Sequence, residues 1–207
     1  MPRKVGDTGG SAWQWSRTAE TRRALLDAAR EVFGEQGFTA ASVASVVERA
    51  GSSVGSLYHH FGGKPELFVA LWEDHQAAHE EASSTAVAKA RAKGENDPLE
   101  LLIIGARAFL EGSWERRDVA RLFMDGDAPP GFEVMRRARN REWVRQNAVL
   151  LGAGAEAGDR LTAAVLTSII GEAGREIATS SSKRAANRIT ERAVRLIRKL
   201  DPLNLED

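Results

Sequence analysis

The sequence predicts an all-α protein of about nine helices. Apolar residues recur every three or four positions along most of the chain, which is the spacing that gives a helix one buried face. No segment alternates apolar and polar residues for long enough to indicate a strand. Clusters of glycine and proline interrupt the periodicity and divide the chain into segments of helical length.

The first helices are short and closely spaced. A helix is expected from Thr18, with Gly37 as the left-handed residue that ends it. Ser42 is a candidate N-cap for a second helix, because it directly precedes a run of valines. A third short helix follows the break at residues 50–53. The fourth begins at Lys64, has a proline in its first turn and runs to about residue 93.

The remainder of the chain predicts five further helices. Their expected ranges are about 98–116, 118–125, 131–151, 159–180 and 182–200. At the other end, residues 1–16 are rich in glycine and lack periodicity, which predicts a flexible arm. The expected domains are therefore this arm, a small helical domain at 17–66 and a larger helical domain at 67–207.

The composition excludes several classes of protein. A chain of 207 residues provides one domain or two small ones. It has no cysteine, which excludes disulfides and thiolate metal sites. No apolar run approaches the ~20 residues of a membrane span, and the first ten residues lack the features of a signal peptide. We therefore expect a cytoplasmic protein with no membrane partner.

Residues 39–61 have the pattern of a helix-turn-helix, with two helices of about two turns joined by a tight turn at Gly51. Val46, Val47 and Leu57 fall on the inner faces of this pair. The outward positions of the second helix are small or carry hydroxyl groups. Such a surface fits deep into a major groove and offers donors to phosphates or base edges. These outward positions are Ser53, Val54, Gly55, Ser56 and His59.

Residues 38–67 resemble the N-terminal domain of TetR-type transcriptional repressors. The most specific matches are Glu48-Arg49-Ala50-Gly51, the run from Gly55 to Phe61, and Lys64-x-Glu66-Leu67. The resemblance implies that the outward positions above contact DNA. It adds Arg17 and Thr18 near the DNA backbone, Ser42 as a phosphate-contacting cap, Tyr58 paired with His59 on phosphates, and Lys64 at the start of the fourth helix.

The resemblance also implies a homodimer that binds a palindromic operator on double-stranded DNA and is released by a small apolar effector. We expect the last two helices to form the dimer interface, because one has a surface of small residues and the other an apolar stripe. The predicted interface residues are Ala164, Ser168, Gly171, Ile189, Ala193, Leu196, Ile197 and Leu200.

The middle helices supply candidates for an effector pocket, since such pockets are mostly apolar with a few polar groups. The apolar candidates are Phe109, Trp114, Phe123, Met124 and Trp143, and the polar ones are Asn147 and Glu172. His75 and His79 have metal-ligand spacing, but no HExxH pattern or cysteine accompanies them, so we expect exposed side chains and no metal. No catalytic motif appears, and neither an enzyme nor a cofactor is expected.

The charge distribution leaves two alternatives open. Residues 17–76 contain six basic and eight acidic side chains, which is not the basic footprint of a typical DNA-binding domain. One alternative is a helical ligand-binding or interaction protein that has lost DNA binding. The other is an activator with no small effector.

Overall fold

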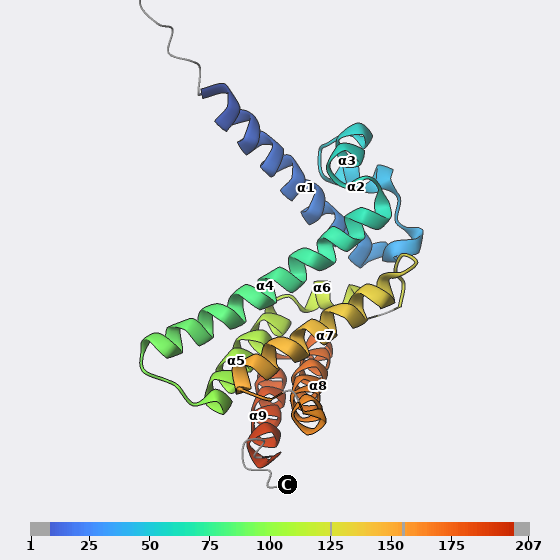
Figure 1. Cartoon of the computed structure of the whole chain (residues 1–207). Coiled ribbons are helices and arrows are strands. Elements are labelled where there is room, and N and C mark those ends of the chain that lie inside the picture. The colour runs from blue at the N-terminus through green and yellow to red at the C-terminus, as the bar shows by residue number, and fades with distance from the viewer. Residues whose placement is uncertain (1–8, 125, 155, 201–207) are drawn as a thin grey trace, which may run out of the picture. The chain divides into compact units, whose positions relative to one another are not determined.

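The computed structural model describes residues 9–124, 126–154 and 156–200, with side chains from Arg17 onward. Every regular element in these ranges is a helix, which confirms the predicted all-α fold. The helices are α1 (Gly9–Ala40), α2 (Val43–Arg49), α3 (Val54–Phe61), α4 (Lys64–Ala92), α5 (Pro98–Glu115), α6 (Arg117–Leu122), α7 (Phe132–Leu151), α8 (Ala157–Thr179) and α9 (Lys183–Leu200) (Figure 1).

The first helix departs from expectation at its start. The backbone is helical from Gly9, whereas the sequence predicts an arm through residue 16. Residues 1–8 of that predicted arm lie outside the described residues. Near the other end, the helical geometry is interrupted at Gly37, whose φ of 79° lies in the left-handed region that favours glycine. The helix is therefore interrupted at Gly37, the glycine that the sequence predicts to end it.

The chain forms two compact units. One contains the residues up to Trp72 together with Asp127–Pro129, and the other contains 73–126 and the residues from 130 onward. The helix α4 runs through both. Leu67 and Phe68, which the predicted boundary assigns to the larger domain, are fully buried within the first unit.

The core of the first unit holds α2 and α3 against α1. Val46 of α2 and Leu57 of α3 have no exposed surface. The rings of Phe33, Phe38 and Phe68 pack together, with centroids 5.0 to 5.9 Å apart. Tilted aromatic contacts of this kind add to the free energy gained by burial. The helix-turn-helix is therefore packed against α1 through a shared apolar core.

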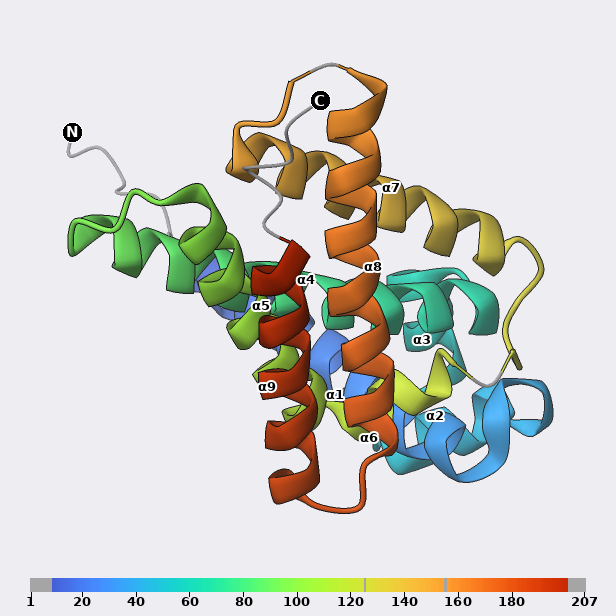
Figure 2. The same ribbon diagram turned by 90° about the horizontal axis from the view of Figure 1, so that it is seen from below.

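The second unit is organised around α8, which packs against α5, α6, α7 and α9. Figure 2 shows α8 and α9 side by side. The close approach of α5 to α8 depends on Gly174, because a Cβ there would lie 2.9 Å from Cε1 of Phe109. One core cluster joins these helices through Leu102, Ile103, Ala106, Leu151, Leu166, Ile170, Val194 and Ile197.

Ion pairs connect the basic side of α9 to α5. Arg107 donates to Glu191 at 2.5 Å, and its charge and hydrogen bonds lower the pKa of that carboxyl. Arg198 pairs with Glu100 in the same way. Exposed pairs contribute little stability each, so α9 is held mainly by its apolar side. None of the helices in the described ranges combines the length and the apolar character needed to cross a bilayer.

Candidate nucleic-acid interface and ligand cavity

The two helices of the helix-turn-helix are capped by serines. The Ser42 hydroxyl oxygen accepts the backbone N–H of Ser45 at 3.0 Å, and that of Ser53 accepts the N–H of Ser56 at 3.1 Å. Each cap satisfies an N–H group that the first turn of a helix leaves without a partner. Since a phosphate only accepts, the hydroxyl protons are what Ser42 and Ser53 can offer to it, and the Ser42 hydroxyl also lies 2.8 Å from that of Ser45.

The outward surface of α3 has the predicted composition. Val54 is 48% exposed and Tyr58 is 53% exposed, while Leu57 between them is buried. A Cβ on Gly55 would meet only the Ser53 hydroxyl, at 4.0 Å, so no packing constraint requires glycine there. The sequence of α3 contains no carboxylate. This surface can therefore approach a polyanion without repulsion from its own side chains.

The other residues predicted to contact DNA differ in how exposed their side chains are. Ser53 and His59 are exposed, and Ser56 is half-buried. Arg17 and Thr18 are exposed on α1, where the Thr21 hydroxyl donates to the backbone carbonyl of Arg17 at 2.9 Å.

Lys64 has a different role from the one predicted. Its ammonium group donates to the carbonyl oxygens of Phe38, Thr39 and Ala41 at 2.8, 3.2 and 2.8 Å. It also lies 4.6 Å from the centroid of the Phe38 ring. An ammonium group has three N–H donors, and all three are used at the end of α1. The predicted phosphate contact by the Lys64 side chain is therefore wrong.

A charge cluster holds two of the acidic side chains of this unit. Arg49 donates to Glu31 at 2.9 Å and to Glu35 at 3.0 Å. The hydrogen bond and charge of Arg49 lower the pKa of Glu35. Two of the acids counted from the sequence, both on α1, are thus paired with one arginine of α2.

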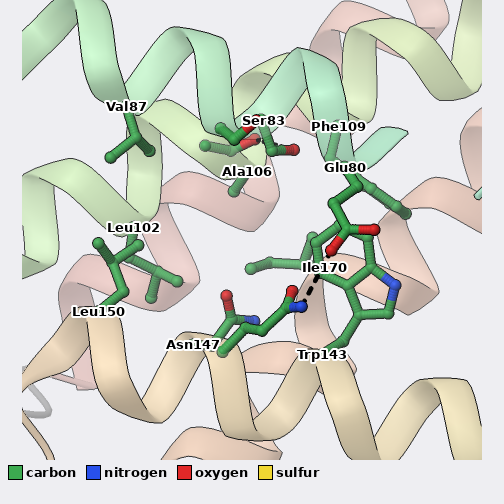
Figure 3. Close-up of a pocket in the computed structure, with 13 residues that line it drawn as sticks. Glu80, Ser83, Val87, Leu102, Ala106, Phe109, Trp143, Asn147, Leu150 and Ile170 are labelled. Atoms are coloured by element: carbon green, nitrogen blue, oxygen red, sulfur yellow. Dashed lines mark hydrogen bonds between the residues drawn. The ribbon is translucent and has the colours of Figure 1, made fainter. Parts of the chain in front are cut away.

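The second unit contains a cavity of about 290 Å³ between α4, α5, α7 and α8. Three predicted pocket residues line it, namely Phe109, Trp143 and Asn147 (Figure 3). Its size falls near the lower end of ligand pockets, which span about 300–1,000 Å³. The other lining residues are Glu80, Ser83, Ser84, Val87, Leu102, Gly105, Ala106, Gln146, Leu150 and Ile170.

Four predicted pocket residues do not line this cavity. Trp114 lies under the guanidinium of Arg117, at 4.2 Å. Phe123 is buried against Phe132, and Met124 follows it at the end of α6. Glu172 is exposed and pairs with an arginine on its own helix. Helical spacing alone does not separate side chains that line a cavity from those that fill a core, which is why these were misassigned.

Glu80 and Gln146 are cavity residues that the sequence analysis missed. Gln146 donates to Glu80 at 3.0 Å, and Arg139 donates to the same carboxylate at 2.7 Å. A signal was present in the sequence, because Glu80, Ser83 and Val87 share one face of α4 at helical spacing.

The two histidines on α4 are buried, which corrects the expectation that they are exposed. His75 and His79 are 5% and 3% exposed, and their Nε2 atoms lie 3.3 Å apart. Burial, with a smaller effect of the charge on Arg116, lowers the pKa of His79 to about 4. The described residues contain no group of three or more potential metal ligands. The two histidine rings belong to the buried core of the second unit.

The predicted dimer interface is partly buried inside the chain. Ala193 and Ile197 are 4% and 0% exposed, because they pack on α5 and α8 within the same chain, so assigning them to an interface was wrong. Leu196 and Leu200 are exposed on the adjoining face of α9. The other predicted positions, all exposed or half-buried, are Ala164, Ser168, Gly171 and Ile189. Leu161 and Val165 extend this exposed surface on α8 and were not predicted.

The capped helix pair, its exposed acid-free surface and the separate helical unit define a helix-turn-helix DNA-binding protein. Residues 25–71 match the family described as bacterial regulatory proteins, tetR family. The region that contains the helix-turn-helix is therefore similar to the DNA-binding domain of this TetR family of regulators. Proteins of this family are regulators of transcription, in agreement with the prediction of a non-enzyme.

Three relatives illustrate the extent of the match. The transcriptional repressor AcnR of Corynebacterium efficiens is 40% identical over 55 residues, which is 27% of this chain and 29% of that protein. The regulator BetI 1 of Chromohalobacter salexigens is 32% identical over 108 residues, which is 50% of this chain and 47% of that protein. The A-factor receptor protein of Streptomyces griseus is 26% identical over 152 residues, which is 70% of this chain and 48% of that protein. The chain thus spans less than half the length of each relative.

Solved structures resemble the fold over most of the chain. A transcriptional regulator from Aquifex aeolicus VF5 has a TM-score of 0.67 at 20% identity, covering 87% of this chain and 99% of the other. A TetR-family regulator from Pectobacterium atrosepticum has a TM-score of 0.55 at 26% identity, covering 89% and 94%. The helical unit after the helix-turn-helix therefore has the same fold as these regulators, although its sequence has diverged.

Proposed function

We propose that the protein is a homodimeric repressor that binds a palindromic operator and is released by a small, largely apolar effector. The observation that carries the proposal is the exposed surface of α3, which is free of acids and held by two serine caps over a buried core. A helix with small residues at its N-terminal end can enter a major groove closely.

The roles of the DNA-contacting residues follow from their position on this surface. Val54, Gly55 and Ser56 face the base edges, and the methyl groups of Val54 suit a thymine methyl group. Ser42, Ser53, Tyr58 and His59 contact phosphates as donors, which position the helix without reading sequence. Arg17 and Thr18 add contacts to the DNA backbone. Lys64 acts indirectly, because it joins the end of α1 to the start of α4.

Dimerisation is supported by the exposed apolar surface on α8 and α9. Two recognition helices that read successive major grooves sit about 34–36 Å apart, which requires two copies of the unit that carries α3. The surface contains leucine and valine side chains beside small residues, which let helices pack closely. We assign to it Leu161, Ala164, Val165, Ser168, Gly171, Ile189, Leu196 and Leu200.

The cavity is the proposed effector site. The relative from Streptomyces griseus is a receptor by name, which supports a ligand-binding role for the unit that contains the cavity. The single helix α4 supplies Leu67 and Phe68 to the core of the first unit and Glu80 and Val87 to the cavity. An effector that binds the DNA-free conformation more tightly shifts the population toward that conformation and releases the operator.

The DNA-binding role is tested at Tyr58, the single tyrosine of the chain. Fluorotyrosine incorporation gives one fluorine resonance on the exposed surface of α3, and we expect it to shift when a selected operator duplex is added. Tyr58→Phe keeps the ring and removes the hydroxyl group, so binding should weaken about tenfold per dimer, equally for operator and unrelated duplexes. An unshifted resonance with every duplex at low salt would favour a protein that has lost DNA binding.

The dimer is tested at Leu196, which is 42% exposed in the single chain. Leu196→Asp places two carboxylates in the proposed interface, so we expect monomers at micromolar concentration in sedimentation equilibrium. Val149→Asp is the matched control, because Val149 is 81% exposed on α7 and outside the proposed interface. If the Leu196 variant stays dimeric, the interface lies elsewhere.

A further inference from the structure

The polar groups around the cavity differ in the hydrogen bonds that they have left to offer. The wall is mostly apolar and aromatic, and the rings of Phe109 and Trp143 lie 5.8 Å apart with an edge-to-face geometry. Figure 3 shows Glu80 on α4 and marks the hydrogen bond that its carboxylate accepts from Gln146. The head group of a ligand is therefore selected by a few polar atoms, whose donor and acceptor roles can be assigned one by one.

The orientation of the Asn147 amide is fixed by its neighbour. The Thr167 hydroxyl gives its only proton to the carbonyl oxygen of Ala163, at 2.7 Å. Thr167 can then only accept from Asn147, so the contact at 2.9 Å must involve the amide nitrogen of Asn147. The Asn147 oxygen remains as an acceptor for a ligand, and the second N–H of its amide remains as a donor.

The Gln146 amide is fixed by the same reasoning. Its partner at 3.0 Å is an oxygen of the Glu80 carboxylate, which only accepts when ionised. The Gln146 nitrogen therefore faces Glu80, and its oxygen is left as an acceptor. Glu80 keeps free lone pairs after the bonds from Gln146 and Arg139, because a carboxylate has about four acceptor positions.

The two serines of the lining are also acceptors. The Ser83 hydroxyl donates to the carbonyl oxygen of Gly105 at 3.2 Å. The Ser84 hydroxyl donates to the carbonyl oxygen of Glu81 at 3.1 Å. Each hydroxyl has one proton, so both are left with lone pairs only. Arg139 donates to Glu80 through Nη2, while its buried Nε has no hydrogen-bond partner among the described residues, and Arg139 is not among the residues that line the cavity.

We infer that the effector is an apolar, aromatic-compatible molecule with a head group that donates hydrogen bonds, and that a protonated amine is the preferred form of this head group. Glu80 and the amide oxygens of Gln146 and Asn147 offer acceptors to the cavity, and an aromatic ring such as that of Trp143 attracts a cation. A carboxylate or phosphate head group is disfavoured, because it meets the charge of Glu80. This inference rests on the proposed effector role of the cavity.

Three probes that share a naphthyl body test this preference. Naphthylethylamine, naphthylethanol and naphthylacetate are titrated into the DNA-free protein by calorimetry. We expect the amine to bind about tenfold tighter than the alcohol, and the carboxylate to bind weakest, because hydrogen bonds to charged groups are the stronger ones. This order of affinities on the unaltered chain needs no variant.

A pair of substitutions locates the preference. Glu80→Gln removes the charge at the cavity and should lower amine affinity about tenfold while changing alcohol affinity little. Glu81→Gln makes the same change on the next residue, whose side chain is exposed, and should leave all three affinities unchanged. An amine affinity that is equal in both variants would overturn the role of Glu80.

The outcomes separate this inference from the function on which it rests. If naphthylacetate binds as tightly as the amine, the donor-head inference is wrong and the effector role of the cavity stands. If none of the three probes binds, both the inference and the cavity as effector site are wrong. Operator binding by α3 is measured without a probe and is unaffected by either result.

Discussion

Val54→Glu is expected to abolish operator binding while leaving the fold intact. Val54 is the first residue of α3 and is 48% exposed, so the new side chain replaces no core contact. A carboxylate in the first turn favours the helix by about 0.3–1 kcal/mol through the helix dipole. In the proposed complex it lies against DNA in both subunits, where like charges cost several kcal/mol, so affinity should fall at least about 100-fold.

The matched control is Val134→Glu. Val134 is a 59% exposed valine in the first turn of α7, so the substitution is chemically the same and lies in the other unit. Its operator affinity in a mobility-shift assay should equal that of the unaltered protein. Equal affinity of the Val54 variant would mean that α3 does not enter the groove.

Acid should destabilise the protein through His79. The pKa of its imidazole is lowered from 6.5 to about 4, so the unfolded chain binds this proton more readily than the folded one between these pH values. The stabilising contribution is complete above about pH 6.5 and is lost as the pH falls toward 4. This difference in the pKa of His79 between the unfolded and the folded chain corresponds to about 3 kcal/mol of unfolding free energy.

Replacing the histidine removes this pH dependence. His79→Leu should be less stable than the unaltered protein at pH 7, because His75 loses its Nε2 partner. The difference in unfolding free energy between the variant and the unaltered protein should narrow as the pH approaches 4. Denaturant titrations at several pH values measure this difference. His59→Leu is the control at an exposed histidine and should leave the slope unchanged. A constant gap from pH 7 to 4 would refute the assignment to His79.

The helix-turn-helix could be predicted from the sequence because its signals are local. Ser42 and Ser53 cap helices through backbone groups three residues away, and Gly51 and Gly62 adopt positive φ values at the two turns. The inward positions of α2 and α3 follow from helical spacing alone. These signals act over one or two helical turns, so the local order of residues is enough to determine the backbone geometry.

The sequence by itself determined the all-α fold, the Ser42 cap and the exposed surface of α3. Only the tertiary structure decided which polar groups are already used by residues far along the chain. Lys64 is bonded to the end of α1 more than twenty residues away. Ile197 is enclosed by core residues from other helices, and His79 is buried against Phe109. Burial and hydrogen bonding depend on which segments meet in space, and helical periodicity gives the direction of a side chain but not its neighbour.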